Sequence, residues 1–135
     1  MEPRAARDLM QRLEADAARI ARRFGLRYRS LRAERAGVNA HYGICYDDGS
    51  IRIRLRHAVH GRPLKYSSLV NTLCHELAHL RHFDHGERFK ALYLELLDWA
   101  RREGIYRPGP GPRPDAPRQV APPVRPGPLQ LALFE

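Results

Sequence analysis

Five residues in the middle of the chain combine two metal ligands with a candidate base. His75-Glu76-Leu77-Ala78-His79 has the pattern H-E-x-x-H. Residues four apart lie on one face of a helix, so His75 and His79 can bind a single metal ion. Zinc favours nitrogen ligands, and a catalytic zinc keeps one position for water. Because Glu76 can accept a proton from that water, the pattern predicts metal-assisted hydrolysis.

A catalytic zinc site needs a third protein ligand from outside this pentapeptide. His85 follows six residues after His79 and lies beyond the expected end of the helix. We favour His85 over His82, because the third ligand must approach from another direction and His82 is only three residues past His79. The other internal histidines are interpreted as surface or structural residues, with substrate contact as the alternative for the last two: His41, His57 and His60.

The segments around this motif alternate between helical and strand patterns. Apolar residues recur at helical spacing over 3–24 and stop at Gly25. Strands are expected at 26–35, 39–46 and 51–56, and Asp47-Asp48-Gly49 predicts the turn between the last two. The motif helix should begin near Tyr66, with Ser67 or Ser68 as its N-cap, and a last helix should cover 87–103. The pattern predicts an α+β domain.

The third expected strand alternates apolar residues with Arg52, Arg54 and Arg56. One face should pack on the helices, and the other should carry like charges that a polyanion would neutralise. The formal net charge of the chain is +9, which favours non-specific, electrostatic binding to DNA. The alternative is a solvated face that prevents aggregation between sheet edges.

Composition divides the chain into three parts. Nine of the eleven prolines follow residue 106, so residues 107–128 are expected to be a flexible linker after a domain at 1–106. Cys45 and Cys74 form no C-x-x-C pair, and a reducing cytoplasm is expected. No signal peptide or membrane span is apparent. We therefore expect a cytoplasmic, nucleoid-associated protein without a membrane partner.

The segment HELAHLRHFDHGERF at 75–89 resembles the SprT-like, YgjP-like and WLM-type zinc peptidases, and the resemblance covers about residues 20–106. It implies a minimal zincin-like α+β domain with an N-terminal helix, a small three-stranded sheet, the H-E-x-x-H helix and a C-terminal helix. It also implies one Zn²⁺ per chain, bound by His75, His79 and His85, with Glu76 as the general base. Spartan-type members cleave proteins crosslinked to DNA. This chain lacks the C-terminal zinc ribbon of SprT proteins.

The end of the chain, residues 129–135, resembles a second known element. Gln130-Leu131-Ala132-Leu133-Phe134 is similar to the Q-L-x-L-F peptide with which bacterial proteins bind the replicative sliding clamp. The resemblance implies that Leu133 and Phe134 fill an apolar pocket while Gln130 hydrogen-bonds at its rim, with the linker giving reach. The alternative is an apolar chain end that packs on its own domain.

These observations predict a bacterial zinc endopeptidase that cleaves DNA-associated or DNA-crosslinked proteins and is recruited to the sliding clamp. One alternative is a zinc hydrolase of a small substrate such as a nucleotide. Another is a non-enzymatic adaptor that binds DNA and the clamp and carries a structural zinc. The adaptor requires a closed site with four protein ligands, whereas a hydrolase requires an open one.

Overall fold

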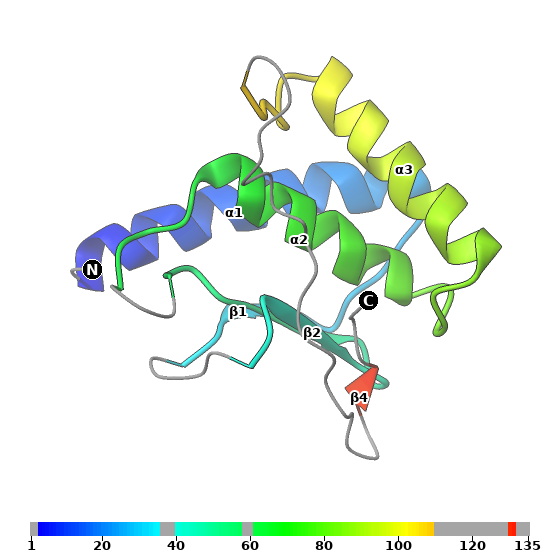
Figure 1. The fold of residues 1–135 in the computed structure, drawn as a ribbon, viewed down its shortest axis with the longest axis horizontal. Coiled ribbons are helices and arrows are strands. Elements are labelled where there is room, and N and C mark those ends of the chain that lie inside the picture. The colour runs from blue at the N-terminus through cyan, green and yellow to red at the C-terminus, as the bar shows by residue number, and fades with distance from the viewer. Residues whose placement is uncertain (1–2, 36–39, 58–60, 110–129, 132–135) are drawn as a thin grey trace.

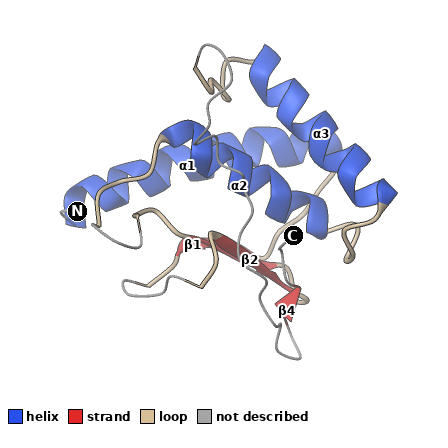
Figure 2. Cartoon of the chain, viewed as in Figure 1, coloured by secondary structure: helices blue, strands red, loops and turns tan. Residues whose placement is uncertain are grey.

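A computed structural model describes residues 3–35, 40–57, 61–109 and 130–131. The elements are α1 (Pro3–Phe24), β1 (Ser30–Ala33), β2 (Gly43–Tyr46), β3 (Ser50–Ile53), α2 (Tyr66–His79), α3 (Glu87–Arg102) and β4 (Gln130–Leu131). The three helices gather on one side of the sheet (Figures 1 and 2). The predicted α+β class is therefore confirmed. No helix within the described ranges is long and apolar enough to cross a membrane.

The sheet has the strand order β1-β3-β2-β4. β1 is parallel to β3, with Leu31 opposite Ile51, and β2 is antiparallel to β3, with Cys45 opposite the same residue. Gly49 forms the predicted turn between β2 and β3 with a φ of 92°, a conformation that favours glycine. β4 adds to the outer edge of β2 and extends the predicted three-stranded sheet.

The core lies between the helices and the inner face of the sheet. Helical spacing on α1 and strict alternation on β3 bring their apolar residues to this layer, as the sequence predicts. Burial of one such large side chain contributes about 1.5–3 kcal/mol, so the sum over these elements is the main force that holds α2 in place. The central residues are Leu13, Ala17, Ile20, Ile51, Ile53, Leu69, Leu73, Leu77 and Leu96.

The strands are shorter than predicted because neighbouring segments take their hydrogen bonds. The Leu26 N–H donates to the Ala21 carbonyl at the end of α1 (2.9 Å), so residue 26 belongs to the helix terminus and not to a strand. Beyond β3, the chain pairs with the segment that leads into α2: the Leu64 N–H donates to the Leu55 carbonyl (2.8 Å). The predicted strands at 26–35, 39–46 and 51–56 are thus reduced to four residues each.

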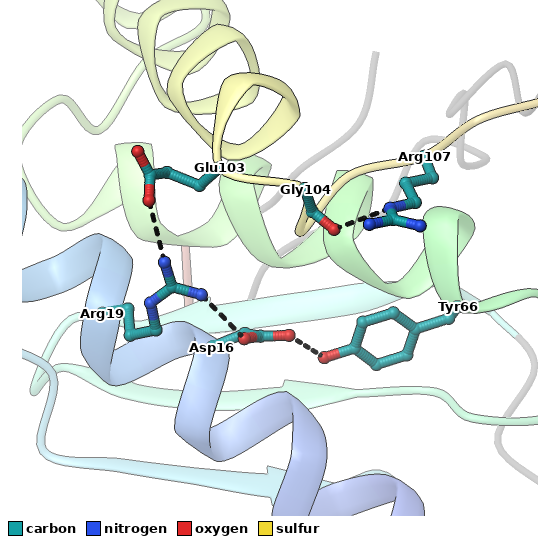
Figure 3. Close-up of polar contacts among 6 residues, drawn as sticks. All are labelled: Asp16, Arg19, Tyr66, Glu103, Gly104 and Arg107. Carbon is teal, nitrogen blue, oxygen red and sulfur yellow. Dashed lines mark hydrogen bonds and ion pairs between the residues drawn. The ribbon is translucent and has the colours of Figure 1, made fainter.

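The predicted N-cap of α2 is wrong. The helix begins at Tyr66, and the N-cap position is Lys65, whose side chain makes no capping hydrogen bond. A tertiary contact fixes this end of the helix: the Tyr66 hydroxyl donates to Asp16 Oδ2 of α1 (2.6 Å; Figure 3). The Arg12 guanidinium also lies 3.6 Å from the centre of the Tyr66 ring. Packing on α1 therefore replaces the local serine cap.

The C-terminal end of α3 is joined to the same part of α1. Arg19 of α1 lies 3.8 Å from Asp16 Oδ1 and donates to Glu103 Oε1 (2.9 Å; Figure 3). One arginine therefore links the residue that follows α3 to Asp16, the partner of Tyr66 at the start of α2. Gly104 then ends α3 with a φ of 77°. The Ile105 side chain is buried, so this segment packs back onto the body of the domain. The end at Arg102 falls one residue before the predicted one.

Candidate metal centre

Three histidines meet where α2 ends and α3 begins. His75 and His79 come from α2, and His85 comes from the connection to α3. One nitrogen from each lies within 4.8 Å of the others, an arrangement that can hold a metal ion. The Nε2 atoms of His79 and His85 are 3.1 Å apart. Three histidine nitrogens are a common ligand set for catalytic zinc and leave the fourth coordination position for water. The structure thus brings together the three residues that the sequence suggested as ligands.

His82 has a different place in this centre. Its main-chain carbonyl lies 3.1 Å from Nδ1 of His79. An Nδ1–H that donates to this carbonyl fixes the orientation of the His79 ring and leaves the Nε2 lone pair for a metal. His82, three residues after His79, therefore contacts the Nδ1 side of the His79 ring, whereas His85, six residues after it, lies on the Nε2 side.

The connection between the helices is shaped by hydrogen bonds at both ends. After α2, the Arg81 and His82 N–H groups both donate to the Ala78 carbonyl (3.1 and 3.0 Å), which tightens the last turn. Before α3, the Gly86 N–H donates to Asp84 Oδ1 (3.0 Å). These bonds fix the chain on either side of His85. Its position is therefore set by local backbone geometry, which is how a short connection can present a ligand accurately.

Phe89, one turn into α3, contacts all three histidine rings. Its ring stacks on His79 with centroids 4.5 Å apart, and meets the rings of His75 and His85 at 4.8 and 5.0 Å. This aromatic wall removes water from the imidazoles. Burial is the main reason that the pKa of His75 falls to about 2 and that of His79 to about 4, and it also lowers the pKa of His85. All three are therefore neutral at pH 7, the form that binds metal.

Glu76 is fully buried, and neither of its carboxylate oxygens has a hydrogen-bond partner among the described residues. Burial raises the pKa of this carboxyl well above its usual range. Nε2 of His75 is likewise buried without a partner. A buried polar group without a partner costs about 1–3 kcal/mol, so these atoms together indicate a ligand that the chain itself does not supply. A metal ion with its water fits this donor set.

Gly43, at the start of β2, packs against the Glu76 side chain. A Cβ atom at this position would lie 2.6 Å from Cγ2 of Thr72 and 3.2 Å from Cγ and Oε2 of Glu76. Only a residue without a side chain lets β2 lie this close to α2. Sequence reasoning missed Gly43, because a single glycine at the start of a strand gives no sign of what it packs against.

A second missed feature is the pair Tyr93 and Asn71. The Tyr93 hydroxyl donates to Oδ1 of Asn71, which lies one helical turn before His75 on α2. The Tyr93 ring is stacked on Phe89 and lies 5.6 Å from the His75 ring. The helical pattern over 87–103 indicates only that Tyr93 lies on the apolar face of the helix. Its spacing of four from Phe89 places both rings on the same face of α3, and this spacing could have identified it.

The arginines of the third strand are distributed as predicted but are partly used by their own chain. Arg52 lies 3.6 Å from Oε1 of Glu34, whose other oxygen is 3.1 Å from Nε2 of His41. Arg54 donates to the His41 carbonyl (3.4 Å) and lies 4.5 Å from the centre of the Tyr42 ring. His41 is thus a buried structural residue, as expected, and two of the three arginines have internal partners.

The remaining predicted residues are not part of the histidine group or lie outside the described ranges. Gln130 and Leu131 form β4, while Leu133 and Phe134 lie outside the part of the chain that the structure describes. His57 is exposed near the end of the segment after β3, and His60 is not among the described residues. Arg56 pairs with Pro63 through an isolated bridge. Cys45 and Cys74 are buried and form no disulfide.

The fold and the histidine group together define an α+β protein with a group of three histidines that could hold a metal ion. A family model described as the WLM domain matches residues 1–107, and the chain belongs to this family of metallopeptidases. A crystal structure of Wss1 from Saccharomyces cerevisiae has the same fold, with a TM-score of 0.68 and 20% identity over 75% of this chain and 83% of that one. The crystal structure of a Wss1 mutant from the same organism has a TM-score of 0.68 and 19% identity, over 76% of this chain and 86% of that one. The curated proteins contain no significant match.

Proposed function

We propose that this chain is a zinc-dependent endopeptidase. The observation that carries the proposal is Glu76: it is fully buried, neither of its carboxylate oxygens has a hydrogen-bond partner among the described residues, and it directly follows His75 of the histidine group. A carboxyl group in this position is costly for stability, and it has a use only where a water molecule and a metal ion complete the site. Membership in the WLM family supports the same reaction.

His75, His79 and His85 would hold the ion, which supplies a Lewis acid that polarises the scissile carbonyl and acidifies a water molecule. Glu76 takes one proton from the attacking water and returns it to the nitrogen of the leaving amine. Because burial raises the pKa of Glu76, the carboxyl can hold this proton between the two transfers. Phe89 keeps bulk water away from the rings. Three protein ligands leave the position that hydrolysis needs, in contrast to a closed structural site.

We further propose that the substrates are DNA-associated or DNA-crosslinked proteins, bound while the enzyme is held near DNA by charge. The net charge of +9 supports this. α1 provides a larger basic surface than the strand arginines, because six of its arginines are exposed to solvent along 22 residues of helix, and of these Arg19 is paired with Asp16 and Glu103. Such contacts are electrostatic and independent of sequence, so binding should weaken with salt. The exposed arginines of α1 are Arg4, Arg7, Arg12, Arg19, Arg22 and Arg23.

Recruitment to the sliding clamp by residues 129–135, across a linker at 107–128, is part of the same proposal. It rests on the similarity of Gln130-Leu131-Ala132-Leu133-Phe134 to the bacterial clamp-binding peptide. Replacement of Leu133 and Phe134 by alanine should abolish binding to a bacterial clamp in solution, while Leu129→Ala, just outside the motif, should preserve it. Unchanged affinity of the double variant contradicts this part of the proposal.

Glu76→Gln tests the peptidase itself. The amide has the same shape but cannot take a proton, so we expect full zinc content with cleavage reduced roughly 10²- to 10⁴-fold. Glu95→Gln is the matched control, because Glu95 is exposed on α3. The assay compares a DNA-crosslinked protein, the same protein without DNA, and a nucleotide. Undiminished proteolysis by Glu76→Gln refutes the mechanism, and hydrolysis of the nucleotide alone favours the small-substrate enzyme.

A further inference from the structure

The last described residues of the chain return to the sheet. β4 runs antiparallel to β2, with Leu131 opposite Cys45 and Gln130 opposite Tyr46 (Figure 1). On its other side β2 already pairs with β3, so β4 takes the edge at which the described domain, residues 3–109, would otherwise present unpaired main-chain groups. An open edge of this kind is a template for any extended peptide.

This edge belongs to the strand that borders the candidate metal centre. Gly43, two residues before Cys45 on β2, is the residue that lies against Glu76. Successive residues of a strand are about 3.3 Å apart, so the β4 pairing begins about 7 Å along the strand from that contact. A peptide in the same register and two residues longer would lie opposite Gly43. An extended chain that reaches Gly43 in this register therefore needs the main-chain groups of β2 that β4 uses.

We propose that the edge of β2 is a peptide-binding edge and that residues 130–131 are its occupant within the same chain, in competition with extended substrates. The consequence for cleavage rests on the proposed peptidase function, but the docking itself does not. Gln130 and Leu131 are also the first two residues of the clamp-like motif. While they pair with β2 they cannot adopt the conformation that an external partner requires, so a partner that captures the motif opens the edge.

The strength of this contact suits a reversible block. A two-residue strand makes few hydrogen bonds, each worth about 0.5–1.5 kcal/mol net. The 20 residues at 110–129 connect β4 to the domain, and a short tether of this kind gives an effective concentration in the mM range. The tethered strand can therefore occupy the edge much of the time, whereas the same peptide free in solution should need roughly mM concentrations to do so.

A pair of proline substitutions in the full-length chain tests the proposal. Gln130→Pro with Leu131→Pro removes two N–H donors and disfavours strand pairing. Gln119→Pro with Val120→Pro is the matched control, because it makes a similar change outside β4. Hydrogen exchange in the zinc-loaded chain should show protection of the Cys45 N–H, which faces β4, that the first double variant loses and the control retains. Equal protection in all three chains overturns the docking.

Binding and cleavage then test the competition. In a Glu76→Gln background, a fluorescent unstructured peptide should bind about three- to tenfold more tightly to the double-proline variant of residues 130–131 than to the control. In the active enzyme, KM for the same peptide should fall by the same factor while kcat stays unchanged. Loss of protection without tighter peptide binding overturns the competition. If no form cleaves any peptide, the peptidase proposal fails, and exchange and peptide binding still decide whether β2 is a docking edge.

Discussion

The histidine centre and the arginine-bearing face of the sheet differ in how their polar groups are satisfied. On the sheet, Arg52 pairs with Glu34, and Arg54 contacts Tyr42 and the His41 carbonyl. A few atoms stay unpaired there, such as Nε of Arg54, but each side chain keeps another contact. In the centre, both oxygens of Glu76 lack a hydrogen-bond partner among the described residues.

This difference teaches which region depends on an external ligand. The charge of Arg52 is balanced by Glu34, and Arg54 contacts a ring and a carbonyl of its own chain, so the geometry of both is explained without an external ligand. The histidine centre instead combines deep burial with unpaired atoms, and folding can afford that only if a ligand completes the site. Both regions are rich in residues that commonly bind ligands, so residue type does not distinguish them. They differ in whether their polar groups find partners within the chain.

The largest effect should come from removing a ligand in the centre. His85→Ala should lower zinc affinity at least about 10²-fold, because a site of three nitrogens loses one of them. His82→Ala is the matched control, since His82 contributes its main-chain carbonyl to the His79 ring and any residue retains that group. Competition with a fluorescent chelator measures both variants. Equal losses in the two would show that the third ligand is wrongly assigned.

Gly43→Ala should damage the centre from outside. The new Cβ would lie 2.6 Å from Cγ2 of Thr72, so β2 or α2 must shift and we expect a loss of about 2–3 kcal/mol of folding free energy. Thr72→Ser in the same chain removes the obstructing methyl group and should restore most of it. Thermal unfolding reads both. A Gly43→Ala chain as stable as the parent would mean that β2 does not press on α2.

Without metal, Glu76→Gln should stabilise the fold at pH 8 by about 1–2 kcal/mol, because it removes a buried carboxyl whose raised pKa disfavours the folded state at that pH. The folded pKa of Glu76 is raised, so its stabilising contribution is present below the usual value of 4.5 and is lost as pH rises. The folded pKa of His75 is lowered from 6.5 to about 2, so its contribution is present above 6.5 and is lost as pH falls towards 2.

Thermal unfolding in a chelator from pH 4 to pH 8 separates the two signs. The gain from Glu76→Gln should shrink as the pH approaches 4.5, whereas both chains should lose stability on acidification below 6.5. A gain that is the same at all pH values would show that the Glu76 carboxyl titrates in the folded chain as it does in the unfolded chain, and would weaken the contrast with the sheet.

The smallest effect should come from the strand arginines. Arg23→Ala on α1 should reduce the slope of log affinity for DNA against log salt by about 1, the value for one lost phosphate contact. Arg52→Ala should change that slope much less, because Arg52 is held by Glu34. Fluorescence anisotropy with a short duplex at several salt concentrations measures the slope. A larger change for Arg52→Ala would restore the strand as the nucleic-acid surface.

The sequence was sufficient for features that depend on periodicity and on short spacings. Pro3–Phe24 and Glu87–Arg102 follow from apolar residues at helical intervals, and the end of α1 at Phe24 follows from Gly25. The grouping of His75, His79 and His85 also follows from spacing, since the first two share a helix face and the third lies six residues later, just beyond the helix. Local geometry dominates in each case.

Features that depend on tertiary contact could not be predicted in this way. Tyr66 begins α2 because Asp16, 50 residues earlier, accepts its hydroxyl, and this contact overrides the serine caps. Gly43 matters because of Thr72 and Glu76 on another element. The pairing of β4 with β2 joins segments separated by a proline-rich stretch that has no periodic pattern. Each of these requires the three-dimensional arrangement to be known first.

Arg81 gives the centre a dependence on the order of assembly. Its Nη2 nitrogen donates to the Phe24 and Gly25 carbonyls (2.9 and 3.4 Å), 57 and 56 residues earlier in the chain. It lies between the second and third histidines, so the bend that presents His85 is tied to the end of α1. Contacts so distant in sequence form late in folding. Refolding followed in the presence of zinc should therefore show metal uptake only after α1 has docked, which makes the ion a reporter of the completed domain.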